Sequence, residues 1–409
     1  MSQLTPYLRR LLIFLSVASF FEGFDFFALA QLLPDIRGAF HLTPKQGGEM
    51  VAFINIGMLL AYFIVRKADD WGRKRVLALT IAGYTASSLL SGLANGVMMF
   101  AVTQLAARVF LTAELSVAMV VTAEEYPAAR RGLVIGIVQA CSSVGAIVCA
   151  GVVPLLLKTG WGWRGVYLIG GLPLCLIAIA RRGLQETSRF AALAPERAAA
   201  RPSLLRVFST PYRSRVLQLA AIWLLTFFCT QSAMLFWKEF AVAERGLSAQ
   251  QVGTCLTVAA LLAVPLVFAV GKLLDSSGRR LGATLVFGLT ISGVVAAYAL
   301  HSQLALTLAL VLGIAGTTAV LSVLHTFTTE LFPTALRSDA YGWSNNLMGR
   351  SAAVLSPLVV GRLAEQLGFG PAVSLTVLGP LIALGMILVL LPETRNKELE
   401  ETAALSVAG

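Results

Sequence analysis

The sequence predicts an all-α membrane protein with twelve transmembrane helices arranged as two six-helix bundles. Three observations carry this prediction: an apolar composition, twelve apolar runs long enough to cross a bilayer, and a repeat that relates the two halves. Of the 409 residues, 57% are hydrophobic and only 13% are charged, and the mean hydropathy is +0.79. A soluble domain carries about 25% charged residues. Most of the surface of this chain must therefore face lipid.

The apolar runs define the predicted helices. A bilayer core of about 30 Å needs roughly 20 apolar residues in each helix, and charged or Gly/Pro-rich joints separate such runs along the chain. We expect spans at approximately 10–34, 47–65, 76–95, 98–122, 133–156, 164–182, 215–237, 250–271, 281–300, 303–328, 339–362 and 371–391. The first run resembles a signal peptide, but Glu22 and Asp25 interrupt its apolar part, so we expect an uncleaved helix.

The basic residues predict the orientation of the chain. Most of the 32 Lys and Arg residues fall at the chain ends and in the loops that follow even-numbered helices. Under the positive-inside rule these segments are cytoplasmic, so we expect both termini on the cytoplasmic side of a bacterial inner membrane. The net charge of +11 then reflects short loops beside anionic lipid. No nucleic-acid partner is expected.

An internal repeat relates the two halves. Shifting the chain against itself by about 206 residues superposes its polar loops. The pattern D-x-x-G-R-[KR] occurs at 69–74 and again at 275–280, and a loop with Glu, Pro and Arg occurs at 125–131 and 330–337. The predicted organisation is an N-terminal bundle at 1–182, a cytoplasmic linker at 183–214, a C-terminal bundle at 215–391 and a cytoplasmic tail at 392–409.

These paired loops, with the E-T-S-R and P-E-T-R segments that end each half, resemble the Major Facilitator Superfamily. The resemblance covers essentially the whole chain. It implies two bundles that rock about a central site, a monomer, and no cofactor, with the proton gradient as the energy source. One departure from the family pattern concerns the glycine that opens the first loop, which is Val65 here, whereas the second copy keeps Gly271.

The loop charges are candidate gating residues. A carboxylate at the cytoplasmic end of a helix can sit against another helix N-terminus and hold that side closed. The alternative is that these charges only set the topology. The predicted gating residues are Asp69, Arg73, Asp275, Arg279, Glu125, Arg131, Glu330 and Arg337.

Ionisable residues inside the predicted spans need a reason, because each costs a few kcal/mol. Glu22 and Asp25 are three residues apart and share a helix face, so their repulsion favours a proton on one of them. The run 21–27, together with Glu114, resembles the acidic motif of the metabolite:proton, sialate:proton and aromatic-acid:proton symporter groups. We predict proton coupling by Glu22, Asp25 and Glu114. The alternative is that buried acids are satisfied by an arginine or by backbone amides.

The eleventh predicted helix carries the main candidate for substrate binding. Residues 342–350 are similar to the G-x-x-x-N-x-x-G-R pattern of organic-acid symporters. Asn346 and Arg350 are four residues apart and would line one helix face, where the guanidinium can grip a carboxylate bidentately. The other predicted substrate-binding residues are Arg108, Gln139, Gln231 and Trp343. The alternatives are ion pairing for the arginines, interhelical hydrogen bonding for the amides and packing for Trp343. His325 is a weaker candidate for a proton relay.

The leading hypothesis is a proton-coupled symporter that imports a small organic anion, such as a mono- or aromatic carboxylate, by alternating access. Three buried acids against two arginines also suit a zwitterionic or cationic metabolite of the betaine or proline type. Drug:proton antiport is less favoured, because the fifth helix lacks the G-P-x-x-G-G signature, and a membrane sensor is the least favoured. No enzyme or metal site is expected, since no nucleophile and base constellation and no metal-ligand spacing occur.

Overall fold

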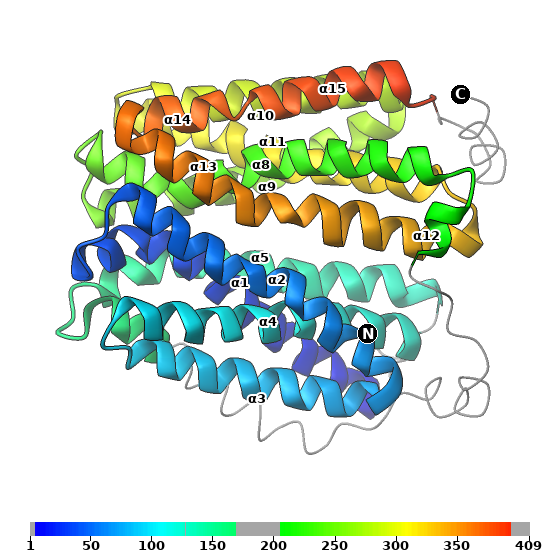
Figure 1. The fold of residues 1–409 in the computed structure, drawn as a ribbon, viewed down its shortest axis with the longest axis horizontal. Helices are drawn as coiled ribbons and strands as arrows, with labels where there is room; N and C mark the ends of the chain where they lie inside the picture. The colour runs from blue at the N-terminus through cyan, green and yellow to red at the C-terminus, as the bar shows by residue number, and fades with distance from the viewer. Residues whose placement is uncertain (1–4, 127, 169–204, 394–409) are drawn as a thin grey trace. The chain divides into compact units, whose positions relative to one another are not determined.

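The structure is a computed structural model that describes residues 5–126, 128–168 and 205–393 (Figure 1). The described residues form helices and contain no strand. Helices of the first half are α1 (Pro6–Ala39), α2 (Pro44–Trp71), α3 (Arg73–Gly92), α4 (Val97–Glu125) and α5 (Ala128–Leu156). Those of the second half are α8 (Arg213–Ala243), α9 (Ala249–Ser277), α10 (Arg279–Ala299), α11 (Gln303–Glu330), α12 (Thr334–Tyr341), α13 (Ala352–Leu367), α14 (Phe369–Leu375) and α15 (Leu378–Leu390).

These helices form two compact units. The first holds α1, the part of α2 from Phe53 onward, and α3 to α5; the second holds α2 up to Ala52 and everything from Pro202 onward. In the first unit α1 packs along α5 and α3 along α4, and in the second α11 packs along both α9 and α10. Of the predicted linker at 183–214, residues 183–204 lie outside the described residues. Of the predicted tail at 392–409, residues 394–409 lie outside them.

Length and composition agree with the membrane class that the sequence predicts. Within the described residues, nine helical segments are long and apolar enough to cross a bilayer. They coincide with the predicted first, second, fourth and seventh to twelfth spans. α3 covers the predicted third span without meeting that criterion, α5 contributes the shorter apolar segment Ala140–Leu156, and most of the sixth span lies outside the described residues. The all-α membrane fold is confirmed.

The repeat predicted from the loops appears as the same backbone geometry in both halves. Gly72 separates α2 from α3 with φ 93°, and Gly278 separates α9 from α10 with φ 90°. This region of φ is open to glycine and strained for other residues. The glycine of the D-x-x-G-R motif is therefore needed to let one helix end and the next begin without a connecting loop.

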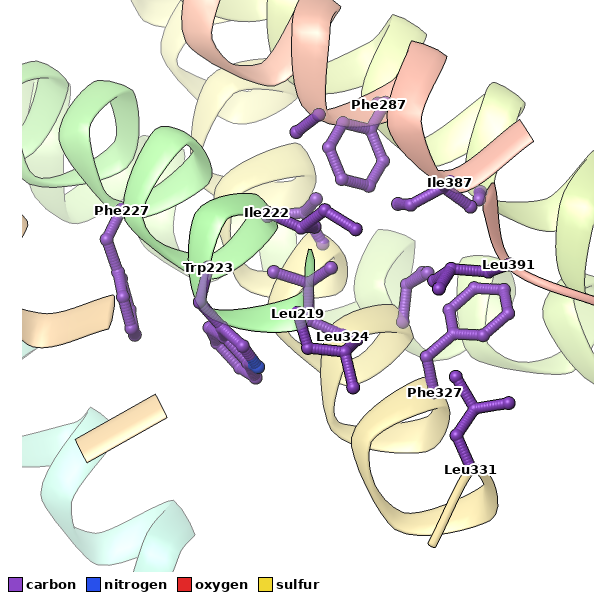
Figure 2. Packing of buried hydrophobic residues seen from close by; sticks show 14 of the residues in the cluster. Leu219, Ile222, Trp223, Phe227, Phe287, Leu324, Phe327, Leu331, Ile387 and Leu391 are labelled. Carbon is purple, nitrogen blue, oxygen red and sulfur yellow. The ribbon is translucent and has the colours of Figure 1, made fainter. Parts of the chain in front are cut away.

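A buried apolar cluster holds the second unit together. Figure 2 shows Leu219 and Ile222 of α8 packed towards Leu324 and Phe327 of α11. Phe287 of α10 and Ile387 and Leu391 at the end of α15 complete the same cluster. Trp223 and Phe227 leave α8 on a different side from Ile222, with their ring centroids 5.0 Å apart. That side of α8 meets the candidate site described below.

The predicted eleventh helix, 339–362, is not one regular α-helix. After α12 the chain forms a π-helix at Gly342–Met348 and a 3-10 turn at Gly349–Ser351 before α13 begins. The N–H of Gly349 bonds to the carbonyl oxygen of Ser344, five residues back, as well as to that of Asn345. A Cβ on Gly349 would lie 2.7 Å from the Cβ of Trp223. Close packing against α8 thus accompanies this irregularity, which a regular 3.6-residue pattern could not reveal.

Candidate functional site

The first unit buries the three carboxyl groups that were predicted to handle protons. Glu22 and Asp25 of α1 are 9% and 7% exposed, and Glu114 of α4 is 4% exposed. Arg108, also on α4, is 5% exposed. Electrostatic interactions link Arg108 to Asp25 and Glu22, and Glu114 to Glu22. The predicted acids and one predicted arginine therefore lie in one charged cluster.

Glu22 lies where α1 crosses α5. The hydroxyl of Ser142 on α5 donates a hydrogen bond to Glu22 Oε2 at 2.7 Å. Gly23 and Gly145 allow the two backbones to touch, since a Cβ on Gly23 would overlap the carbonyl oxygen of Ser142, and a Cβ on Gly145 would overlap that of Phe20. Two glycines therefore set the position of Glu22 relative to α5.

Asp25 has different neighbours from Glu22, although the two residues are only three apart in the sequence. Its carboxyl lies beside Tyr84 and Ser88 of α3 and is attracted by Arg108. The carboxyl that interacts electrostatically with Glu114 is that of Glu22. The structure thus separates the two acids of α1 into one that faces Glu114 and Ser142 and one that faces α3.

Arg108 is held by packing. Its guanidinium carbon lies 4.6 Å from the ring centroid of Phe26, a cation–π geometry. Gly57 of α2 leaves room for it, because a Cβ there would lie 3.0 Å from the Cβ of Arg108. Among the described residues, Arg108 Nη1 and the hydroxyl of Tyr167 are both buried without a hydrogen-bond partner, and these two side chains interact electrostatically.

In the second unit, Arg350 lies in the 3-10 turn beside a histidine and tyrosine pair. His325 Nδ1 and the hydroxyl of Tyr341 are 2.8 Å apart, and their rings are nearly parallel, at 15°. Arg350 interacts electrostatically with both. Trp223 of α8 meets the His325 ring edge to face, with centroids 4.9 Å apart.

Sequence reasoning missed Tyr341 and Trp223. Tyr341 ends α12 next to the residues that were singled out, and Trp223 is fully buried at 0% exposed. No local pattern distinguishes Trp223 from the other aromatic residues of α8. Its hydrogen bond to Thr328 Oγ1 of α11, at 2.9 Å, links two helices far apart in sequence, and periodicity contains no such information.

The π-helix changes the expected relation between Asn346 and Arg350. In a π-helix the backbone hydrogen bond spans five residues instead of four, so a four-residue spacing no longer ensures that Asn346 and Arg350 share a face. Asn345 is 1% exposed, and its Oδ1 has no hydrogen-bond partner among the described residues. Asn346 is partly exposed. Spacing alone favoured Asn346, because it presupposed a regular α-helix.

The remaining predicted substrate residues are less constrained. Trp343 in the π-helix is partly exposed and meets Phe208 edge to face, with centroids 5.0 Å apart. Gln231 is partly buried on α8. The side chain of Gln139 lies outside the described part of the structure. These three residues therefore stay predictions.

Some predicted gating residues form a network at the start of α10. Arg279 Nη2 and Glu330 Oε1 form an ion pair at 2.9 Å, with side chains 26% and 17% exposed. The carboxylate of Glu393 accepts hydrogen bonds from the backbone N–H groups of Arg279 and Arg280, at 2.9 and 3.0 Å. Arg73 is 6% exposed and Glu125 is partly buried. The side chains of Asp69, Asp275, Arg131 and Arg337 lie outside those that the structure describes.

The Glu393 interaction gives a stability prediction. Glu393→Ala leaves two N–H groups at the α10 N-terminus without their acceptor and removes a negative charge from the positive end of the helix dipole. We expect a loss of about 1 kcal/mol in the free energy of unfolding, measured by thermal unfolding in detergent. Glu49→Ala, at a partly exposed position, is the control, and an equal loss in both variants would contradict the capping role.

Comparison with known proteins identifies the family. The Major Facilitator Superfamily profile matches residues 15–357 and 232–406. The niacin transporter NiaP of Acinetobacter baylyi is 24% identical over 418 residues, with 93% of each chain covered, and the sialic acid transporter NanX of Escherichia coli is 26% identical over 390 residues, with 90% of each covered. The fold matches the D-xylose-proton symporter with a TM-score of 0.77 at 15% identity, covering 96% of this chain and 99% of that one. The chain therefore belongs to the Major Facilitator Superfamily and is a multi-pass membrane transporter of small organic molecules, not an enzyme.

Proposed function

We propose that the protein is a proton-coupled symporter that imports a small organic carboxylate by alternating access. The observation that carries this proposal is the buried cluster of the first unit. In it, Glu22 and Glu114 interact with each other, whereas the guanidinium of Arg108 interacts more strongly with Asp25 than with Glu22. The protein would act in a bacterial inner membrane with both termini in the cytoplasm.

The proton would be carried by the acids of this cluster. Two nearby carboxylates in a low-dielectric interior repel each other, and burial makes each negative charge expensive. One proton shared between Glu22 and Glu114 relieves both effects. Asp25 differs, since Arg108 compensates its negative charge.

The anion would be bound in the second unit by Arg350. A guanidinium presents a planar pair of donors that matches a carboxylate, and Arg350 interacts electrostatically with Tyr341 and His325, which supports a polar site around it. Irregular backbone at membrane depth is tolerated where it is buried in protein or lines a cavity. Niacin and sialic acid, the substrates named for two relatives, are both carboxylic acids, which supports this class of substrate.

Charge balance would couple the two events. The three acids and two arginines carry a net charge of −1 when all are ionised, so one proton restores neutrality before an anion enters with its own charge. A proton and an anion that each make the other's binding more favourable are thermodynamically linked. Symport follows if the fully loaded and the empty protein change conformation more readily than the half-loaded forms.

Uptake into liposomes tests this function. Vesicles with a trapped pH dye receive nicotinate, sialic acid, glycine betaine or xylose in separate experiments, with protein-free vesicles to account for undissociated acids that cross lipid unaided. We expect protein-dependent internal acidification with a carboxylate. Arg350→Gln should reduce it at least about tenfold, because it removes a charge-assisted bidentate contact.

Arg362→Gln is the matched control, because Arg362 is an exposed arginine on α13 and its loss should leave uptake unchanged. Acidification by betaine with both acids inert would instead support the zwitterionic substrate. Substrate uptake without any pH change would reject proton coupling. Equal losses in the Arg350 and Arg362 variants would reject Arg350 as the anion ligand.

A further inference from the structure

We propose that Ser142 on α5 is a positioning residue that sets the proton affinity of Glu22. Its hydroxyl donates a hydrogen bond from α5 to the Glu22 carboxyl, and the close helix crossing sets the position of its backbone. The inference rests on the proposed role of Glu22 in proton handling. Nothing in the sequence pattern singles out Ser142, which is one of two adjacent serines in an apolar run.

The crossing leaves the hydroxyl little freedom to move. An ideal Cβ on Gly23 would lie 2.6 Å from the carbonyl carbon of Ser142 and 2.8 Å from its Oγ. One turn along the pair, a Cβ on Gly145 would lie 2.8 Å from the carbonyl carbon of Phe20 and 3.0 Å from the backbone nitrogen of Phe24. Because the two backbones touch on both sides of the contact, the backbone of Ser142 cannot move away from Glu22 unless the helices separate.

Other charged and titratable groups also act on Glu22. Glu114 and Arg108 approach from α4 and Tyr84 from α3, and each interacts electrostatically with Glu22. Glu114 disfavours the ionised form of Glu22, whereas Arg108 favours it. Ser142 adds a short hydrogen bond from a neutral donor, 2.7 Å from Oε2. This contact changes the balance between the opposing effects of Glu114 and Arg108 without changing the net charge of the cluster.

The sign of the effect follows from hydrogen-bond strength. A hydroxyl donates a stronger hydrogen bond to a carboxylate than to a neutral carboxyl group. Ser142 therefore stabilises ionised Glu22 and helps it release its proton. When Ser142 loses its hydroxyl, Glu22 should keep the proton to higher pH, so release, and with it the return of the empty carrier, should become harder.

Infrared titration of the purified full-length protein in lipid nanodiscs tests this directly. The probe is the proton itself: the carboxyl C=O stretching band that disappears in Glu22→Gln reports the proton that Glu22 shares with Glu114, and its pH midpoint is measured. In Ser142→Ala we expect that midpoint to rise by about one pH unit. Ser142→Cys, which keeps a weak donor of similar size, should give an intermediate value. Ser232→Ala is the control, because its buried hydroxyl donates a hydrogen bond to the carbonyl of Phe228 in its own helix.

The outcomes separate the inference from the function on which it rests. A Glu22 band with the same midpoint in Ser142→Ala as in the unmodified protein would overturn the role of Ser142 and leave the proton role of Glu22 standing. A spectrum in which Glu22→Gln removes no titrating band would overturn both. An equal shift in Ser232→Ala would show a general effect of losing a buried hydroxyl and would also overturn the proposal.

Discussion

Gly23→Ala is expected to destabilise the protein by about 1–3 kcal/mol and to reduce transport sharply. The added methyl group would overlap the carbonyl oxygen of Ser142, and backbone atoms cannot change rotamer to avoid it. α1 and α5 must separate, which breaks the contact between Ser142 and Glu22. Gly145→Ala should act in the same way from the other helix, because its methyl group would overlap the carbonyl oxygen of Phe20.

Gly38→Ala provides the matched control. Gly38 also lies in α1, but a Cβ there meets no atom within 4 Å. Alanine at this position should leave stability unchanged or raise it by up to about 1 kcal/mol, since glycine weakens a helix. Thermal unfolding in detergent, with uptake in liposomes, measures both variants. Equal stability of Gly23→Ala and Gly38→Ala would show that the backbones do not touch at Gly23.

The fold was accessible from the sequence because the bilayer imposes simple rules. A membrane span must be apolar and long, so composition and run length predict helices without any knowledge of their neighbours. The loop glycines Gly72 and Gly278 were visible as a repeated motif, and both adopt the positive φ that glycine permits. Each of these inferences needs only local sequence or a comparison of the chain with itself.

The site was accessible only in part, because it depends on contacts between helices. Buried charges such as Glu114 are conspicuous in an apolar run, and they do cluster in the first unit. Spacing placed Asp25 on the same face as Glu22, but three residues still leave the two side chains about 60° apart around the helix axis, which is enough to give them different neighbours. Ser142 became visible only when the crossing of α1 and α5 was known.

The π-helix marks the limit of periodicity for the second unit. Sequence spacing assumes that every turn has the same number of residues, and the wider turn at Gly342–Met348 removes that assumption for the residues before Arg350. The packing of Gly349 against Trp223 involves α8, more than a hundred residues away. A single sequence contains no signal for such an encounter.

Glu22→Gln and Glu114→Gln are each expected to abolish proton-driven accumulation while leaving substrate exchange intact. A carboxamide keeps the shape of the side chain and cannot release a proton, so the loaded carrier can still move but gains nothing from the gradient. In liposomes with an imposed pH gradient, the accumulation ratio of nicotinate should fall to about one. Counterflow, which needs only the movement of loaded carrier, should continue. Glu49→Gln, outside the buried cluster, should behave like the unmodified protein.

Comparison of the two single variants decides whether the two acids act as one site. If Glu22 and Glu114 share a single proton, they titrate as a pair, and losing either should abolish accumulation, whereas full accumulation in one of the two variants would assign the proton to the other acid alone. Loss of exchange together with accumulation would indicate structural damage and contradict the shared-proton site. If Asp25→Asn abolished accumulation while both glutamine variants still accumulated substrate, the proton site would be Asp25, the acid beside Tyr84 and Arg108. Charge compensation by Arg108 argues against that result, because a carboxylate with a nearby cation has less need of a proton than two carboxylates that face each other.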